Sequence, residues 1–94
     1  MSRKPLIVGN WKMFKTGAEA KATARQLVCL IEDRKKVEIL ICPPFTALSV
    51  VSSVLQGSLV QLGAQNVHWG DDGAFTGEVS AHMLLECGCR YVIV

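Results

Sequence analysis

Short apolar runs alternate with amphipathic stretches along this chain. The apolar runs at 6–8, 38–42, 59–64 and 91–94 have the length of buried strands. They are apolar on both faces, as parallel strands covered by helices are. The pattern therefore predicts an α/β fold in the order βαβαβαβ, with right-handed crossovers between neighbouring parallel strands.

The stretch between the first two strands carries the signals of an amphipathic helix. Thr16 followed three residues later by Glu19 has the form of a capping box. Apolar residues then recur at helical spacing on one face, which comprises Ala20, Ala24, Leu27 and Ile31. We predict a helix that buries this face and ends near Asp33, with Arg34-Lys35-Lys36 as its solvated end.

Two further helices are predicted from their boundary residues. Thr46 is the expected cap of a second helix that runs to about Leu55 and is ended by Gly57. Its expected buried side comprises Leu48, Val51 and Leu55. Ser80 begins a short third helix over 81–87, which Gly88 closes.

The segment 65–79 is rich in glycine and has no clear period, so we predict a long loop. Long loops in compact α/β domains are uncommon and often functional, although a mobile surface loop is the plainer alternative. His68 and Trp69 are interpreted as packing within this loop. His82, on the short third helix, is interpreted as a surface or helix-packing residue.

The run LIVGNWKMF places a lysine close after the first strand. If strand alternation continues, Val8, Asn10 and Lys12 share a face. Ligands of parallel α/β folds bind at the carboxyl ends of the strands. An ammonium beside an amide there suits an anionic substrate such as a phosphate ester, and an exposed lysine at a strand exit is the alternative.

Composition excludes several classes of function. The 94 residues are 50% hydrophobic and 19% charged with a net charge of +2, which indicates a globular domain and gives no support for nucleic-acid binding. No apolar run is long enough for a membrane span, and the N-terminus does not resemble a signal peptide, so a cytoplasmic protein is expected. Dinucleotide, P-loop and nucleophile-elbow motifs are absent from the sequence.

The four cysteines have no regular metal-ligand spacing, even together with the two histidines. We expect buried, reduced thiols at Cys29, Cys42, Cys87 and Cys89. The last apolar run reaches the end of the chain without a cap. An open strand edge is therefore expected, either paired with another segment or belonging to a fragment.

Three motifs together carry a resemblance to a known family. The segments GNWKMF, ICPPFTAL and LGAQNVHWGDDGAFTGEVSAHMLLECGCRYVIV resemble the N-terminal part of triosephosphate isomerase. The resemblance implies a parallel (β/α)8 TIM barrel, of which residues 1–94 form only the N-terminal half of a single domain without linker. It implies the glycolytic and gluconeogenic interconversion of dihydroxyacetone phosphate and glyceraldehyde 3-phosphate through an enediolate, without metal or organic cofactor.

The resemblance also assigns roles to individual residues. Asn10 and Lys12 match the substrate-binding positions, and Lys12 is catalytic because its ammonium stabilises negative charge that develops on oxygen. The loop 65–79 matches the interface loop of a homodimer, with Thr76 at its tip and Met13 on the rim of the receiving pocket. The remaining interface positions are Gln65, Gly77 and Glu78.

The resemblance places the electrophilic histidine, the general-base glutamate and the lid outside this sequence. We therefore expect the 94 residues alone to be inactive. The alternative function is a non-catalytic binding or assembly unit that pairs with a complementary barrel half. A flavodoxin-like open sheet is a third interpretation.

Overall fold

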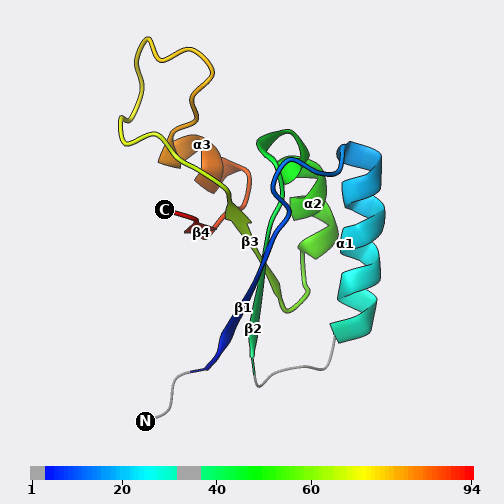
Figure 1. The fold of residues 1–94 in the computed structure, drawn as a ribbon. Coiled ribbons are helices and arrows are strands. Elements are labelled where there is room, and N and C mark those ends of the chain that lie inside the picture. The colour runs from blue at the N-terminus through cyan, green and yellow to red at the C-terminus, as the bar shows by residue number, and fades with distance from the viewer. Residues whose placement is uncertain (1–3, 32–36) are drawn as a thin grey trace.

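The computed structural model describes residues 4–31 and 37–94, which form a four-stranded parallel sheet with its connecting helices. The strands lie side by side in sequence order and are β1 (Leu6–Asn10), β2 (Glu38–Cys42), β3 (Val60–Ala64) and β4 (Tyr91–Val92). The helices are α1 (Gly17–Ile31), α2 (Leu48–Leu55) and α3 (Ala81–Glu86). The predicted βαβαβαβ order is confirmed (Figure 1).

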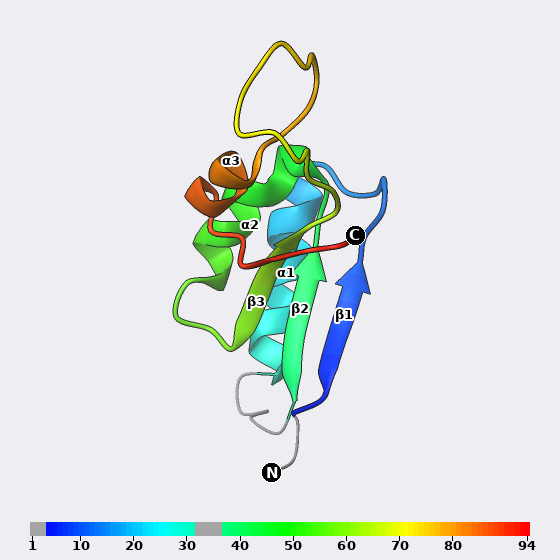
Figure 2. The same ribbon diagram turned by 90° about the vertical axis from the view of Figure 1, so that its left-hand side faces the viewer.

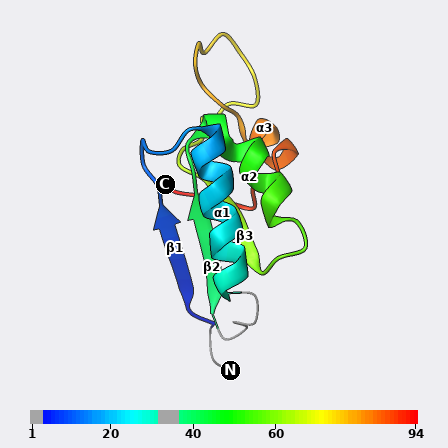
Figure 3. The same ribbon diagram turned by 90° about the vertical axis from the view of Figure 1, so that its right-hand side faces the viewer.

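Both long helices cover the same face of the sheet. Figures 2 and 3 show opposite sides of the molecule, with the strands in front of α1 and α2 in one view and behind them in the other. The core lies between these layers and contains Ala20, Ala24, Ile41, Leu48, Val51, Leu55, Val60 and Leu62. The predicted buried faces of both helices are confirmed, since Leu27 and Ile31 also pack against this core.

The opposite face of the sheet, which we call the inner face, carries no helix layer in the described structure. A Cβ on Gly63 would lie 2.9 Å from Cys42 Sγ and 3.3 Å from Tyr91 Cβ, so these residues meet on this face. The Tyr91 hydroxyl donates to Glu38 Oε1 at 3.1 Å across the same face. The expectation that both faces of every strand are covered is wrong at β1, where Val8, in register with Leu40 on the inner face, is 44% exposed.

The second helix does not begin as predicted. Phe45–Ala47 form a 3-10 turn, and α2 starts at Leu48 without a side-chain cap. The preceding Pro44 has the fixed φ of proline and starts this turn, which places Thr46 inside it. The prediction of Thr46 as a helix cap is therefore wrong, whereas Gly57 does follow the helix end with a φ of 77°.

The third helix begins and ends as its sequence signals predict. Ser80 Oγ accepts a hydrogen bond from Met83 N at 3.3 Å, and Gly88 follows the helix with a φ of 94°. The last strand is shorter than expected because it pairs only with the final residues of β3, Gly63 and Ala64. The expected helix end near Asp33 and the basic residues 34–36 lie outside the described residues.

The parallel arrangement brings all carboxyl ends of the strands to one edge of the sheet. The turn 11–16 after β1 and the loop 65–79 after β3 both leave from this edge (Figure 2). In barrels and open sheets of parallel strands this edge holds the ligand. None of the helices in ranges 4–31 and 37–94 has the length and apolar character needed to span a bilayer.

Candidate functional site

The backbone at Lys12 has an uncommon conformation for a lysine. Strand β1 ends at Asn10, whose Oδ1 accepts a hydrogen bond from Lys12 N at 2.9 Å. Lys12 has a φ of 55°, in the left-handed region that favours glycine. Phe14 N donates to Trp11 O at 3.2 Å and closes the turn.

The extended backbone of β1 ends before Lys12. Alternation of faces requires extended backbone, and the extended backbone stops at Asn10. Alternation therefore does not extend to Lys12, and the face that its side chain takes stays a prediction. What brings Asn10 and Lys12 together is a local hydrogen bond at the carboxyl end of β1.

The turn is also attached to the neighbouring strands. Gln65, directly after β3, donates from Nε2 to Lys12 O and to Cys42 O, both at 2.8 Å. Trp11 N donates to Cys42 O at 3.2 Å. The ends of β1, β2 and β3 therefore meet at one side-chain amide and one carbonyl.

The turn carries positive charge into open solvent. Lys12 and Lys15 are both exposed, and Lys15 Nζ lies 6.0 Å from the centroid of the Trp11 ring. The turn leads directly into the N-terminus of α1 at Gly17, which adds the positive end of a helix dipole. Because Lys12 is exposed, its ammonium stays hydrated and there is no desolvation cost at this position. A charged group of this kind suits an anionic ligand.

A capping contact fixes the start of α1 behind this turn. Thr16 N and Thr16 Oγ1 donate to Glu19 Oε1 at 3.0 and 3.1 Å. The hydrogen bond from the Thr16 backbone, followed by the one from its hydroxyl, holds the pKa of Glu19 below its ordinary value. The glutamate arm of the predicted capping box is therefore confirmed.

The loop 65–79 is closed at its base and packed on itself. His68 N donates to Val79 O at 2.8 Å, and the His68 ring lies 4.3 Å from the Phe75 ring. Gly70 N donates to His68 Nδ1 at 3.0 Å. His68 packs as predicted, whereas Trp69 stacks on it at 5.5 Å and is still 90% exposed, so only one side of Trp69 packs.

The structure separates the predicted interface residues into two groups. Thr76, Gly77 and Glu78 are exposed in the protruding loop (Figure 1), and Met13 is 93% exposed in the turn after β1. Gln65 is half-buried and bonded within its own chain. Sequence reasoning missed this bridging role, although the position of Gln65 directly after a strand was the signal for it.

The cysteines occupy different environments. Burial raises the pKa of Cys42, and the pKa of Cys89 rises to about 11, mainly through burial. Cys29 is exposed and Cys87 is half-buried, so the prediction of four buried thiols is wrong for these two. Within residues 4–31 and 37–94, no group of histidine, cysteine and acidic side chains could hold a metal ion.

His82 is a surface residue, as predicted, with its Nε2 4.0 Å from Asp71 Oδ1.

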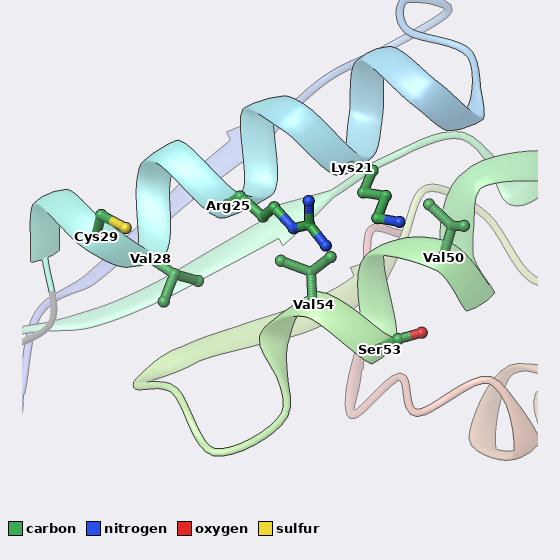
Figure 4. A pocket seen from close by; sticks show the side chains of 7 residues that line it. All are labelled: Lys21, Arg25, Val28, Cys29, Val50, Ser53 and Val54. Atoms are coloured by element: carbon green, nitrogen blue, oxygen red, sulfur yellow. The ribbon is translucent and has the colours of Figure 1, made fainter.

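A groove of about 540 Å³ lies on the outer side of the molecule between α1 and α2. Figure 4 shows Lys21 and Arg25 of α1 reaching toward Val50 and Val54 of α2 across it. Its lining contains no residue of the turn 11–16 or the loop 65–79, so it is separate from the carboxyl-end site.

Comparison with solved structures identifies the fold. Against a crystal structure of triosephosphate isomerase from Bartonella henselae, the TM-score is 0.91 at 42% identity, covering 98% of this chain and 38% of that one. The four parallel strands and their helices are thus the N-terminal half of a (β/α)8 barrel.

Sequence comparison gives the family. The triosephosphate isomerase family model matches residues 5–94. The chain is 55% identical over 93 residues to triosephosphate isomerase of Trichormus variabilis, and 51% identical over 92 residues to that of Carboxydothermus hydrogenoformans. These matches cover 98% of this chain but only 39% and 37% of the two relatives. The chain belongs to the triosephosphate isomerase family.

Proposed function

We propose that the complete protein containing this chain interconverts dihydroxyacetone phosphate and glyceraldehyde 3-phosphate by proton transfer through an enediolate. The observation that carries this proposal is the exposed Lys12, held at the carboxyl ends of three strands by Asn10 and Gln65. Family membership supports the choice of substrate. We also propose a cytoplasmic location, because the reaction belongs to glycolysis and gluconeogenesis.

The chemistry gives Lys12 its role. Removal of a proton next to a carbonyl places negative charge on oxygen, close to the dianionic phosphate of the same substrate. A fixed ammonium stabilises that charge more strongly in the transition state than in the ground state, which raises kcat. We assign substrate binding to Asn10 and Lys12, and the catalytic electrostatic role to Lys12.

The described chain supplies only part of such a site. Proton transfer needs a general base and an electrophile, and the resemblance places both in the remainder of the barrel. We therefore propose that residues 1–94 are the N-terminal part of a single barrel domain and are inactive alone. The metal-free and cofactor-free mechanism of this family is part of the proposal.

Isomerase assays on two samples test the proposed activity. The complete protein should interconvert the two triose phosphates and, in D2O, incorporate solvent deuterium next to the carbonyl. The purified segment should show no turnover above buffer. A complete protein without isomerase activity would refute the proposed function, and turnover by the segment alone would refute its proposed incompleteness.

A second candidate function applies to the segment by itself. Leu6, Ile7 and Val8 of β1 are 44–56% exposed, which is unusual for consecutive apolar residues of a parallel strand. This observation favours an assembly unit that pairs with a complementary barrel half. Adding the C-terminal remainder in trans should then restore activity, whereas aggregation without activity would argue against it.

We further propose that the complete protein is a homodimer in which the loop 65–79 docks on the partner's turn 11–16. Both parts leave from the same edge of the sheet and are exposed in the single chain, including Met13, Thr76, Gly77 and Glu78. The self-packed loop is a preformed docking element, which lowers the entropy cost of association. Sedimentation of the complete protein should show a dimer, and a monomer at micromolar concentration would contradict this.

A further inference from the structure

We infer that Gln65 is a positioning residue that fixes the direction of the Lys12 side chain. The inference rests on the proposed function, because it concerns how the proposed catalytic ammonium is held. Gln65 directly follows β3 and touches the turn after β1 through its side-chain amide. In the resemblance, by contrast, Gln65 stands only among the interface residues.

The backbone of Lys12 is held from both sides. Its N–H donates to Asn10 Oδ1 at 2.9 Å, and its carbonyl accepts from Gln65 Nε2 at 2.8 Å. The two peptide groups that flank its Cα are therefore each tied to a side chain of a strand end. When both peptide groups are fixed, the direction of the Cα–Cβ bond is fixed as well. This bond sets the direction in which the side chain with its ammonium leaves the backbone.

The conformation of Lys12 explains why such support is needed. A φ of 55° is unfavourable for a residue with a Cβ and persists only where surrounding contacts determine it. Trp11 packs against the core at the start of the turn, but residues 12–16 are exposed, so apolar packing does not reach Lys12 itself. At Lys12 the support comes from hydrogen bonds to its backbone N–H and carbonyl.

A second hydrogen bond from Gln65 attaches its side-chain amide to β2. The same Nε2 donates to Cys42 O at 2.8 Å, at the end of the buried strand β2. The β2 carbonyl also accepts from Trp11 N at 3.2 Å. Gln65 thus ties Lys12 to the most buried part of the sheet edge, with both amide protons used.

Removal of the donor tests this role in the complete protein. Gln65→Met keeps the length of the side chain and loses both hydrogen bonds. We expect kcat/KM to fall about tenfold to a hundredfold, as displacement of a reacting group by about 1 Å does. Gln56→Met, the same change at an exposed position after α2, should leave kcat/KM unchanged.

A double-mutant cycle separates positioning from general structural support. If Gln65 acts through Lys12, adding Gln65→Met to Lys12→Met should lower kcat/KM no further. An equal fold-loss in both backgrounds would overturn the inference while leaving the proposed function intact. A Lys12→Met protein with unchanged activity would instead remove the role proposed for Lys12, and with it this inference.

The interface assignment of Gln65 gives a competing explanation that the same samples test. Each variant is assayed over a range of protein concentrations, with its oligomeric state measured by sedimentation. A loss of activity that is independent of concentration supports positioning. A loss that disappears at high concentration would assign the effect to dimerisation and overturn the inference.

Gln65→Glu keeps the inference testable if the methionine variant does not fold. Its carboxylate faces two carbonyl oxygens, and protonation restores one donor. The ratio of its kcat/KM to that of the unsubstituted protein, measured where both proteins are folded and in the same oligomeric state, should therefore rise as the pH falls. A ratio that stays constant with pH would overturn the inference.

Discussion

Two segments leave the carboxyl edge of the sheet and are stabilised in different ways. The turn 11–16 has strained backbone at Lys12 and is held by side chains of neighbouring strand ends. The loop 65–79 is held by its own residues, through the bond between His68 and Val79 and the packing of His68 on Phe75.

The difference corresponds to what each segment is proposed to do. A cation that stabilises developing charge needs a fixed position relative to the substrate, so its support comes from the rigid sheet. A docking loop needs its shape before it meets a partner, so its support is internal. Gln65 connects the two segments, because it is the first residue of the loop and its side chain donates a hydrogen bond to the turn.

Loss of the cation should have the largest effect. In the complete protein, Lys12→Met should lower kcat by about 10²–10³-fold, the range found for a single stabilising donor. Thermal stability should change little, because Lys12 is exposed. Steady-state kinetics and thermal unfolding measure both effects.

Lys21→Met serves as the matched control, because it removes the same charge from an exposed position on α1. It should leave kcat within about twofold, since long-range charge effects in salt are weak. If kcat fell equally in the two variants, the effect of Lys12→Met would come from the change in net charge and not from the position of Lys12.

Disruption of the loop's internal packing should have a smaller effect, on association. Gly73 has a φ of 143°, and a Cβ there would lie 2.6 Å from Phe75 Cε2. We expect Gly73→Ala to weaken dimerisation about tenfold or more, because its strain and the displaced ring cost about 1–3 kcal/mol. Sedimentation equilibrium over a concentration series measures the change.

Gly17→Ala provides the same chemical change next to the other segment. A Cβ on Gly17 meets nothing within 4 Å, so dimerisation should be unaffected. If both alanine variants dissociate equally, the internal packing of the loop does not govern docking.

The smallest effect should come from the capping contact behind the turn. The hydrogen bonds from Thr16 lower the pKa of Glu19 in the folded protein, so its ionised form contributes stability above the pKa of the unfolded chain. This contribution is lost as the pH falls through the folded pKa. Glu19→Gln should therefore lower Tm at pH 7, and the difference from the unsubstituted protein should shrink toward pH 3.

A Tm difference that stayed constant over this pH range would show that the charge of Glu19 does not contribute. The position is fully exposed, so solvent screening keeps the effect small. Thermal unfolding of both proteins in the same buffers makes the comparison direct.

The sequence predicted the architecture because the fold depends on patterns that are local in the chain. The periodic face from Ala20 to Ile31 and the cap at Ser80 both specify their elements without distant partners. The prediction of Thr46 as a cap failed because the preceding proline started a 3-10 turn. The prediction of covered strands failed at β1 because coverage depends on what lies beyond a strand, which its own residues do not encode.

The candidate site was predictable only in part, for a similar reason. Asn10 and Lys12 are close in sequence, so their proximity at a strand end could be inferred. The left-handed backbone of Lys12 and the bond from Gln65 depend on three strands meeting in space. The alternation of side chains along one strand predicts neither the left-handed backbone nor the bond from Gln65.

The most direct test is a crystal structure of the complete protein with a phosphate-bearing mimic of the enediolate. Lys12 Nζ should lie within about 3.2 Å of a ligand oxygen. Gln65 should keep its hydrogen bonds to the Lys12 and Cys42 carbonyls. A ligand bound elsewhere, with the Lys12 ammonium in solvent, would show that this turn does not present the cation to the substrate.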